Sequence, residues 1–374
     1  MPLKLAYLVT EDWAFYRHRL PMARAAKAAG YEVHVLTRVE ERRSEIEREG
    51  FTLHPLSWRR SGISPMATYA SVMEVRRILR AIDPAVVHNV AMKPAIVGSL
   101  AARGLQGAGI VNSINGLGSA FLPTTAKGRL MKRGLETLLP HLIDGRRSRT
   151  IVQNPEDHAT MLALGVDASR VVLIPGSGVD TDAMTPLPEP PGPVKAAYVG
   201  RMLEDKGLRA LIAAHRLLRQ RGERVELLLA GEPDPGNPTS ITGDELRSWA
   251  AEPGVQWLGH VEHIRDVWAQ SHIAVLPSRR EGLPKSLLEA AAFGRPMVAT
   301  DAPGCREVAV EGNTGLLVPI DDAAALADAL SKLAASPELR ARMGANARRL
   351  TEERFSSADI GRKTVEVYRS VSPA

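Results

Sequence analysis

The sequence contains a single cysteine, Cys305, among its 374 residues. One thiol excludes an internal disulfide and any metal site that needs several cysteines, and it is consistent with a reducing compartment. Also missing are a run of about 18 uncharged apolar residues and a positively charged leader followed by an apolar stretch. We therefore expect neither a membrane span nor a secretory signal, and we expect the protein to stay in the cytoplasm.

Acidic residues are fewer than basic ones. The 48 Lys and Arg residues outnumber the 42 Asp and Glu residues and give a net charge of +6. This excess favours anionic partners, which include nucleic acid, acidic lipid and phosphorylated small molecules. The basic residues are scattered along the chain and no nucleic-acid-binding motif occurs, so we expect no nucleic-acid partner.

The chain is long enough for two domains, and its 44% hydrophobic and 24% charged residues are typical of globular proteins. Apolar strand-like segments alternate with helical ones, which predicts a parallel sheet covered by helices on both faces. The predicted strands in the first half are "LKLAYLV", "YEVHVLT", "FTLHPL", "AVVHNV", "GIVNSI", "TIVQN" and "VVLIP". Those in the second half are "VKAAYVG", "VELLLAG", "VQWLG", "IAVLPS", "PMVAT" and "GLLVP".

The alternation stops at residues 176–193, where proline and glycine are dense. This composition suits neither a helix nor an internal strand, so we interpret it as a linker. The predicted organisation is an α/β lobe at 1–175, the linker, and a second α/β lobe at 194–355. From its length, we expect the segment 356–374 to cross back to the first lobe. Open parallel sheets bind ligands at the carboxyl ends of their strands, so two facing lobes would form a deep cleft.

A basic loop follows the first strand of the second lobe. The stretch "YVGRMLEDKG", residues 198–207, carries Arg201 and Lys206. An arginine fork and a mobile lysine charge together suit the oxygens of a diphosphate. The alternative is a solvated loop in which these cations pair with Glu204 and Asp205.

An acidic loop and a helix follow a later strand, in "REGLPKSLLEAAAFG", residues 280–294. Pro284 suits the first turn of a helix, so Glu289 lies inside an apolar helical segment, where a carboxylate needs a partner. Backbone N–H groups at 284–287 would favour an anion, and Glu281 and Glu289 could accept sugar hydroxyls. The pattern predicts a nucleotide-sugar site. In the alternative, Glu289 bonds a buried backbone group or a basic side chain.

These residues resemble the marks of the GT-B glycosyltransferases of family 4. The family has two glutamates separated by seven residues, here Glu281 and Glu289, and Gly-Arg and Lys-Gly pairs, here Gly200-Arg201 and Lys206-Gly207. The stretch "PGSGVD" at 175–180 is close to the family's Pro-Asn-Gly-Val-Asp, with Ser177 replacing Asn.

The resemblance implies two Rossmann-like lobes and a retaining enzyme. It also implies that Arg201 and Lys206 hold the donor diphosphate, that Glu281 lies at the donor sugar and that Glu289 receives the ribose hydroxyls. With Arg201, Lys206 and Glu281 as the catalytic residues, the candidate donor-binding residues are Gly200, Gly282, Leu283, Pro284, Lys285, Ser286, Leu287 and Glu289.

The first lobe offers residues for an acceptor. The stretch "TEDWAFYRHRLP", residues 10–21, concentrates aromatic residues in a chain with only 4% of them. Many family members have a glycine-rich loop at this point, and its absence makes an acceptor platform the better interpretation. In the alternative, these aromatics wedge the first helix onto the sheet. The acceptor candidates, including residues that follow two further strands, are Trp13, Tyr16, Arg17, His18, His88, Lys93, Asn115 and Gly116.

His88 is also a hypothetical general base, and a satisfied histidine at a strand end is the alternative. Gly116-Leu117-Gly118 is too short for a dinucleotide fingerprint, so we do not expect a nicotinamide enzyme.

Lys93 followed by Gly-Leu-Gly and an aromatic looks similar to transferases that extend undecaprenyl-diphosphate-linked saccharides, with the N-acetylgalactosaminyltransferase branch nearest. The segment 124–149 independently favours a membrane-facing surface, because apolar residues repeat at helical spacing beside basic ones. Core packing with a solvated basic rim is the alternative. The apolar residues are Met131, Leu135, Leu138, Leu139 and Leu142, and the basic ones are Lys127, Arg129, Lys132, Arg133, Arg146, Arg147 and Arg149.

The predicted function is a retaining, metal-independent transfer of a sugar, an N-acetylhexosamine by resemblance, from a UDP-sugar to a lipid-linked saccharide at the inner face of the cytoplasmic membrane. We expect no cofactor. Asp180-Thr-Asp182 resembles a metal-binding Asp-x-Asp pair and supports a rival, metal-dependent mechanism. A nucleotide-sugar epimerase of the same fold and a transferase with a soluble acceptor would also be compatible with these residues.

Overall fold

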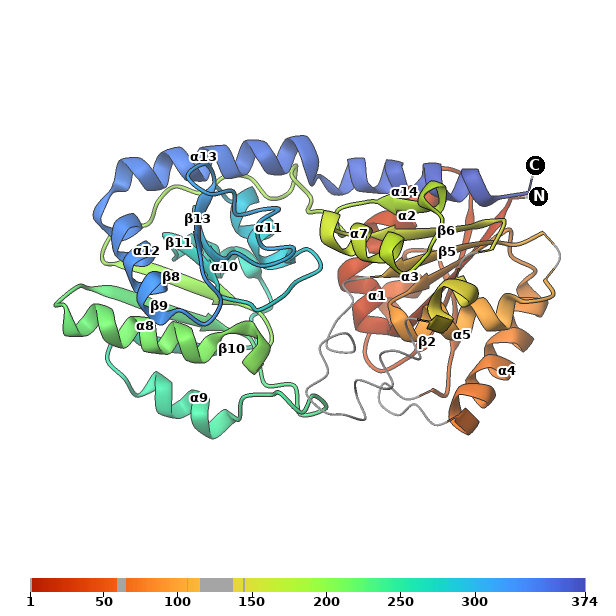
Figure 1. Cartoon of the computed structure of the whole chain (residues 1–374), viewed down its shortest axis with the longest axis horizontal. Helices are drawn as coiled ribbons and strands as arrows, with labels where there is room; N and C mark the ends of the chain where they lie inside the picture. Colours follow the sequence, from red (N-terminus) through yellow and green to blue (C-terminus); the bar gives the residue numbers. More distant parts are fainter. Residues whose placement is uncertain (1, 59–64, 106, 115–136, 144, 374) are drawn as a thin grey trace. The chain divides into compact units, whose positions relative to one another are not determined.

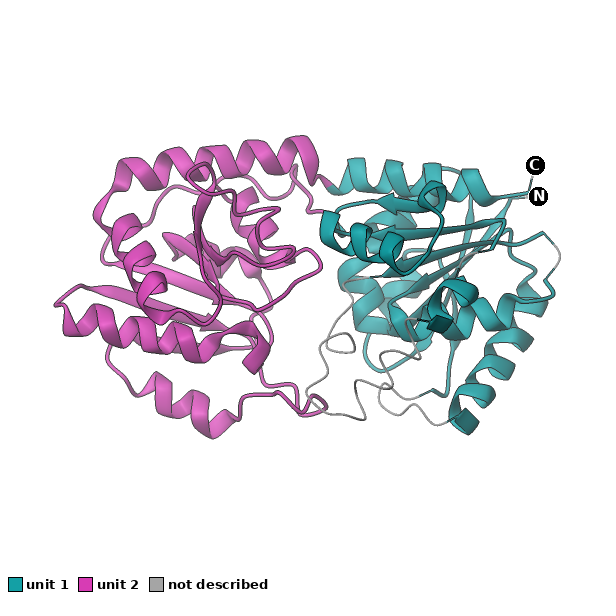
Figure 2. Ribbon diagram, viewed as in Figure 1, with its two compact units in different colours: residues 1–177, 357–374 teal, residues 178–356 magenta. Residues whose placement is uncertain are grey.

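The computed structural model describes residues 2–58, 65–105, 107–114, 137–143 and 145–373. It divides into two compact units, residues 1–177 with 357–374 and residues 178–356 (Figure 2). Each unit is a parallel sheet with helices, so the predicted α/β fold class is confirmed. Asn115 and Gly116, two of the acceptor candidates, lie outside the described residues.

Unit 1 contains a seven-stranded parallel sheet in the order β3-β2-β1-β4-β5-β6-β7. The labels β2, β5 and β6 mark this sheet in Figure 1. Its strands are β1 (Lys4–Glu11), β2 (Glu32–Arg38), β3 (Thr52–Pro55), β4 (Val86–Val90), β5 (Gly109–Ile114), β6 (Ser148–Val152) and β7 (Val171–Leu173). Its helices include α1 (Asp12–His18), α2 (Leu20–Ala28), α3 (Arg43–Arg48), α4 (Pro65–Ile82), α5 (Met92–Ala102), α7 (Pro155–Ala163) and α14 (Ser357–Val371).

The last helix, α14, packs within unit 1 against α2 and β5. Two glycines allow this close packing, because a Cβ at Gly109 would lie 2.4 Å from the carbonyl oxygen of Val371, and one at Gly361 would lie 2.8 Å from the Ala25 Cβ. The Tyr368 hydroxyl is 2.6 Å from the Tyr7 hydroxyl at the centre of the sheet. The core of unit 1 therefore includes residues from both ends of the sequence.

Unit 2 contains a six-stranded parallel sheet in the order β10-β9-β8-β11-β12-β13. Its strands are β8 (Val194–Val199), β9 (Val225–Ala230), β10 (Val255–Gly259), β11 (Ile273–Leu276), β12 (Met297–Thr300) and β13 (Gly315–Val318). Its helices are α8 (Leu208–Gln220), α9 (Gly243–Ala250), α10 (Ile264–Ala269), α11 (Lys285–Ala292), α12 (Ala323–Ala335) and α13 (Pro337–Arg354).

Both sheets reverse their strand order at one place, between β1 and β4 in unit 1 and between β8 and β11 in unit 2. At such a switch point the loops after the two neighbouring strands turn to opposite faces, which opens a crevice at the strands' carboxyl ends. The fold therefore directs attention to the loops that follow β8 and β11.

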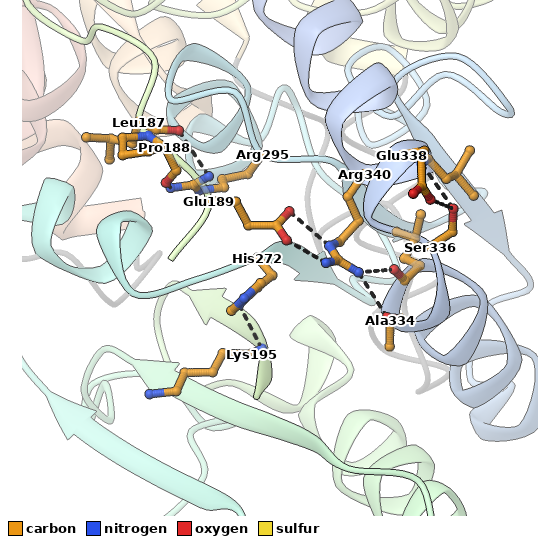
Figure 3. Close-up of polar contacts among 12 residues, drawn as sticks. Leu187, Pro188, Glu189, Lys195, His272, Arg295, Ala334, Ser336, Glu338 and Arg340 are labelled. Carbon is orange, nitrogen blue, oxygen red and sulfur yellow. Dashed lines mark hydrogen bonds and ion pairs between the residues drawn. The ribbon is translucent and has the colours of Figure 1, made fainter. Parts of the chain in front are cut away.

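The proline-rich segment that we interpreted as a linker lies in unit 2 from residue 178 onward. The buried Arg340 guanidinium donates to the Glu189 carboxylate, and also to the Leu333 and Ala334 carbonyls that end α12 (Figure 3). Arg295 donates to the Leu187 and Pro188 carbonyls at 3.2 and 2.8 Å. These guanidinium groups fix the segment to its own unit, so it is not a free tether.

Candidate functional site

The basic and acidic loops chosen from the sequence follow β8 and β11, which are adjacent strands at the switch point of unit 2. Gly207 determines how closely the loops approach. Its φ is +73°, and a Cβ there would lie 2.0 Å from the Pro277 carbonyl oxygen. In addition, the Arg279 N–H donates to the Asp205 carbonyl at 2.9 Å. The two loops thus form one continuous surface.

Lys206 and Glu281, one from each loop, are in direct contact. Lys206 Nζ lies 2.5 Å from Glu281 Oε1, and Ser278 Oγ donates to the same oxygen at 2.6 Å. Both members of the ion pair are partly buried, so the charge-assisted bond is only partly screened by solvent. One carboxylate oxygen therefore orients the lysine that we expect to meet a phosphate.

Arg201 is held by a residue that the sequence analysis missed. Its Nη1 donates to Asp234 Oδ2 at 2.7 Å, and its carbonyl accepts the Tyr198 hydroxyl at 2.7 Å. Burial, followed by the charge of Glu281, raises the pKa of Tyr198 well above its usual value, so the hydroxyl stays a donor. Asp234 follows β9, the strand beside β8, and a carboxylate after a neighbouring parallel strand is the signal that could have identified it.

The loop that carries Asp234 is tied to the Arg201 loop by backbone bonds. The Met202 N–H donates to the Glu232 carbonyl at 3.0 Å, and the Glu204 N–H donates to the Thr239 carbonyl at 2.8 Å. The alternative interpretation paired the two cations with Glu204 and Asp205. In the structure Arg201 pairs with Asp234 and Lys206 with Glu281 instead.

Helix α11 begins one residue later than the sequence predicted, with Pro284 as its N-cap. The expected set of four N–H donors at 284–287 is wrong. Proline has no N–H, and the Leu287 N–H donates to the Pro284 carbonyl at 3.1 Å. Lys285 and Ser286 are the two positions whose amides suit an anion at this helix end.

Glu289 is buried on α11, as the apolar pattern around it predicted. Lys285, one turn earlier, has its Nζ 3.9 Å from Glu289 Oε1. Lys285 is therefore a basic partner of the Glu289 carboxylate, as the alternative interpretation of Glu289 predicted. The ribose role of Glu289 remains a prediction.

The other donor candidates differ in how far they are buried. Gly200 lies close to Tyr198, since a Cβ there would be 2.9 Å from the tyrosine hydroxyl. Gly282 and Leu283 are partly buried, whereas the Leu287 side chain is buried in the core of unit 2. Cys305 is buried too, and burial raises the pKa of its thiol, which excludes a reactive thiolate.

His88 is not placed as a base would need to be. Its side chain is fully buried, with Nδ1 2.7 Å from the Tyr368 hydroxyl and Nε2 2.7 Å from the Ser113 hydroxyl. Burial, with a smaller contribution from the charge of Arg19, holds the pKa of His88 well below its usual value. Both ring nitrogens are used inside unit 1, so the structure favours the satisfied strand-end histidine and we withdraw His88 as base and as acceptor contact.

The aromatic stretch after β1 contains both buried and accessible side chains. Phe15 is buried against Tyr7 and Phe51, which is the predicted wedge of the first helix onto the sheet. The four acceptor candidates of this stretch stay at least partly accessible, and Trp13 Nε1 donates to Glu11 at 2.8 Å. These accessible residues are Trp13, Tyr16, Arg17 and His18.

Lys93 lies at the start of α5, with its Nζ 5.5 Å from the centroid of the Trp58 ring. Partial burial lowers its pKa. The acceptor candidates that the structure describes lie in unit 1, and the donor candidates lie in unit 2.

The structure also gives the contacts of the Asp180-Thr-Asp182 stretch, which resembles a metal-binding pair. Asp180 Oδ1 accepts the N–H groups of Asp182 and Ala183 at 3.1 and 2.9 Å, so this carboxylate closes a turn. Within the described ranges, no group of three or more His, Cys, Asp or Glu residues could hold a metal ion.

The apolar face expected in 124–149 is divided where the structure describes it. Leu139 is buried in the core of unit 1, whereas Leu138 is exposed. Met131, Leu135 and the basic residues from Lys127 to Arg133 lie outside the described residues. Among the helices that the structure describes, none is long and apolar enough to cross a membrane.

Comparison with known proteins identifies the family of this chain. Residues 193–336 match the family model of the glycosyl transferases group 1, and residues 4–145 match the glycosyl transferase 4-like model. EpsD of Bacillus subtilis, whose name assigns it to the glycosyltransferases, is 27% identical over 98% of this chain and 97% of its own.

A second relative is the N,N'-diacetylbacillosaminyl-diphospho-undecaprenol alpha-1,3-N-acetylgalactosaminyltransferase of Campylobacter jejuni. It is 23% identical over 92% of this chain and 93% of its own. Among solved structures, Anabaena HepE in complex with UDP and glucose superimposes with a TM-score of 0.80 at 17% identity, covering 98% of this chain and 100% of that one. The chain belongs to the group 1 and 4-like glycosyltransferases, and its fold is GT-B.

Proposed function

We propose that this glycosyltransferase moves a sugar, of the N-acetylhexosamine class, from a UDP-sugar to a saccharide linked to a polyprenyl diphosphate, with retention of configuration and without a metal ion. The observation that carries the proposal is the pair of cations at the switch point of unit 2, each held by one carboxylate: Arg201 by Asp234 and Lys206 by Glu281. A diphosphate is the anion that two such cations would neutralise together.

The names of two similar proteins support the proposed donor and acceptor. The structure of HepE contains UDP and glucose, and the Campylobacter relative is named for a diphospho-undecaprenol acceptor. A polyprenyl chain keeps its saccharide at a membrane, so we propose that the protein works at the inner face of the cytoplasmic membrane. Unit 1 would supply the acceptor contacts through Trp13, Tyr16, Arg17, His18 and Lys93.

In the proposed reaction, the bond between the anomeric carbon and the diphosphate oxygen breaks while the acceptor oxygen bonds to the same face of that carbon. The acceptor's proton passes to the departing diphosphate. Arg201 and Lys206 stabilise the negative charge that grows on the leaving group, which is the step where positioned charges are most effective. As the phosphate draws Lys206 away, Glu281, still bonded to Ser278, becomes an acceptor for a sugar hydroxyl.

The decisive test is transfer by Arg201→Ala and Lys206→Ala. Each loses one positioned cation, and loss of such a donor typically lowers the rate about a hundredfold or more. The measurement is turnover of UDP-N-acetylhexosamines with a diphosphate-linked acceptor. Arg209→Ala is the matched control, because this exposed arginine of α8 pairs with two carboxylates, Glu204 of the preceding turn and Glu245 of α9. Folded variants with the wild-type rate would refute the assignment.

Two additional conditions separate the rivals. Turnover should persist in chelator, whereas a loss that manganese restores would support the metal-dependent mechanism. Isomerisation of the donor without any acceptor would identify an epimerase, and transfer to free saccharides alone would identify a soluble acceptor.

A further inference from the structure

Helix α4 of unit 1, drawn in orange in Figure 1, exposes an unusual row of apolar side chains. Met66, Tyr69 and Met73 are 82%, 66% and 43% exposed. They follow one another at three and four residues, so they lie on one face of the helix. Three of the eight large apolar side chains that are exposed in the described residues therefore belong to this one face.

The side chains of these three residues are not part of the hydrophobic core of unit 1. The helix packs inward through another face, whose buried residues are Val72, Val75, Ile78, Leu79 and Ile82. Contiguous exposed apolar residues on a globular protein mark a surface that meets a partner.

Basic residues continue the same face toward the helix C-terminus. Arg77 and Arg80 are exposed and lie four and seven residues after Met73, in the same helical row. The one acidic residue of α4, Glu74, is engaged elsewhere, since its carboxylate accepts the N–H and hydroxyl of Ser57. The exposed face is thus apolar in its first half and cationic in its second.

We propose that this face, which consists of Met66, Tyr69, Met73, Arg77 and Arg80, rests in the interface of an anionic lipid bilayer. Apolar side chains enter the boundary between headgroups and acyl chains, a tyrosine suits that depth, and guanidinium groups bind lipid phosphates. The helix lies on the surface and does not span it. The inference rests on the proposed function insofar as a lipid-linked acceptor requires the enzyme to reach a membrane.

A second copy of the chain fits this face less well. In a two-fold contact the face meets itself, so Arg77 and Arg80 would face either the apolar half or the arginines of the copy. Burying guanidinium groups without partners is unfavourable. A lipid surface offers acyl chains to the apolar half of the face and phosphates to its cationic half.

The experiment measures co-sedimentation of the full chain with vesicles of phosphatidylglycerol mixed with phosphatidylcholine, and with phosphatidylcholine vesicles alone. The wild type should bind the anionic vesicles, and added salt should weaken binding. Two variants, Met66→Ser/Tyr69→Ser/Met73→Ser and Arg77→Gln/Arg80→Gln, should each lose affinity about tenfold or more. The arginine variant should also lose most of the salt dependence.

Matched controls carry the same kinds of change elsewhere. Leu162→Ser/Leu173→Ser removes apolar side chains that are 37% and 45% exposed on unit 1, and Arg342→Gln/Arg349→Gln removes two exposed charges from α13. Both should bind vesicles like the wild type. Unchanged binding by both α4 variants, or no vesicle binding by the wild type, would overturn the inference. A wild-type dimer that the apolar variant abolishes would assign the face to a second copy.

Transfer to an acceptor with a short, water-soluble prenyl chain distinguishes the two proposals. If the α4 variants keep wild-type turnover with it but lose vesicle binding, the inference stands together with the proposed function. If no acceptor is glycosylated while vesicle binding still depends on α4, the proposed function fails and the inference stands.

Discussion

Asp234 and Glu281 each form an ion pair with a cation, Arg201 or Lys206, that we expect to bind the donor diphosphate. The two ion pairs differ in whether the cation can bind a phosphate without leaving its carboxylate. Arg201 gives Asp234 one nitrogen of a planar fork, so its other donors can face a phosphate without breaking the pair. Lys206 has a flexible stem, and it can turn from Glu281 to a phosphate oxygen. We infer that Asp234 acts as a positioning residue for Arg201.

Asp234→Ala should therefore lower kcat/KM for the nucleotide sugar about tenfold or more, because misplacement of a charge by about 1 Å is costly in a preorganised site. Asp234→Asn, whose amide oxygen can still accept from Arg201, should recover most of the loss. Steady-state kinetics with Asp244→Ala as control provide the check, since this exposed aspartate pairs only locally, with Arg247. A higher kcat/KM in Asp234→Ala would mean that the aspartate competes with the donor.

The sequence predicted that Arg201 and Lys206 lie in a loop after a strand, and the structure places them there. It did not predict Asp234 or the buried position of His88. Arg201, Lys206 and Glu281 lie in the loops that follow β8 and β11, so the pattern of strands was enough to predict that their loops are neighbours. Asp234 lies in a stretch of turn residues that resembles any surface loop. His88 looked accessible because its partner Tyr368 is 280 residues further along the chain.

At the scale of elements, the approach of the β8 loop to the β11 loop depends on one glycine. Gly207 combines a positive φ with contact to the Pro277 carbonyl, and it precedes α8 directly after Lys206. Gly222 has nearly the same φ, +77°, but nothing lies within 4 Å of the position that its Cβ would take. A comparison of the two glycines therefore distinguishes the cost of backbone strain, which both share, from the cost of close contact, which only Gly207 has.

Gly222→Ala should destabilise the protein by about 1 kcal/mol through backbone strain alone and should leave turnover intact. Gly207→Ala should cost about 1–3 kcal/mol more, because the added methyl overlaps a carbonyl and must push the loops apart. It should also lower turnover, since Lys206 moves with the loop. Urea denaturation and kinetics of both variants are the measurements, and equal losses of stability would contradict the close-contact argument.

The strands were the most predictable elements. All thirteen strand-like segments found in the sequence correspond to strands of the two sheets, because buried parallel strands are short, continuous apolar runs. Helix α4 was not recognised as a separate surface. Whether Met66, Tyr69 and Met73 face the core or the solvent depends on how the whole helix is rotated, and a helix with apolar residues on two sides leaves that open.

For the whole molecule, acid should be destabilising in a defined range of pH. Burial lowers the pKa of five histidines from the ordinary value of 6.5, namely His34, His54, His88, His215 and His272. The unfolded chain then binds more protons than the folded one at pH values below 6.5. This contribution to stability is therefore complete above that pH and is lost as the pH falls toward the folded-state values.

The free energy of unfolding should accordingly decrease between pH 6.5 and about pH 5, before carboxylates with lowered pKa values begin to contribute. Urea unfolding across this range tests the sign. His88→Gln should show a shallower dependence on pH than the wild type, whatever its overall stability. A flat or opposite dependence in the wild type would contradict the lowered pKa of these histidines.

The last helix has a consequence for synthesis. Residues 1–177 leave the ribosome long before residues 357–374, so the growing chain lacks Tyr368 and the rest of α14 while the first sheet assembles. Residues 178–356 form a continuous segment that contains all of its own strands. Since units that hold all their own contacts can fold as they emerge, we expect the second unit to become native first, and the first unit to become native only after residues 357–374 have been made.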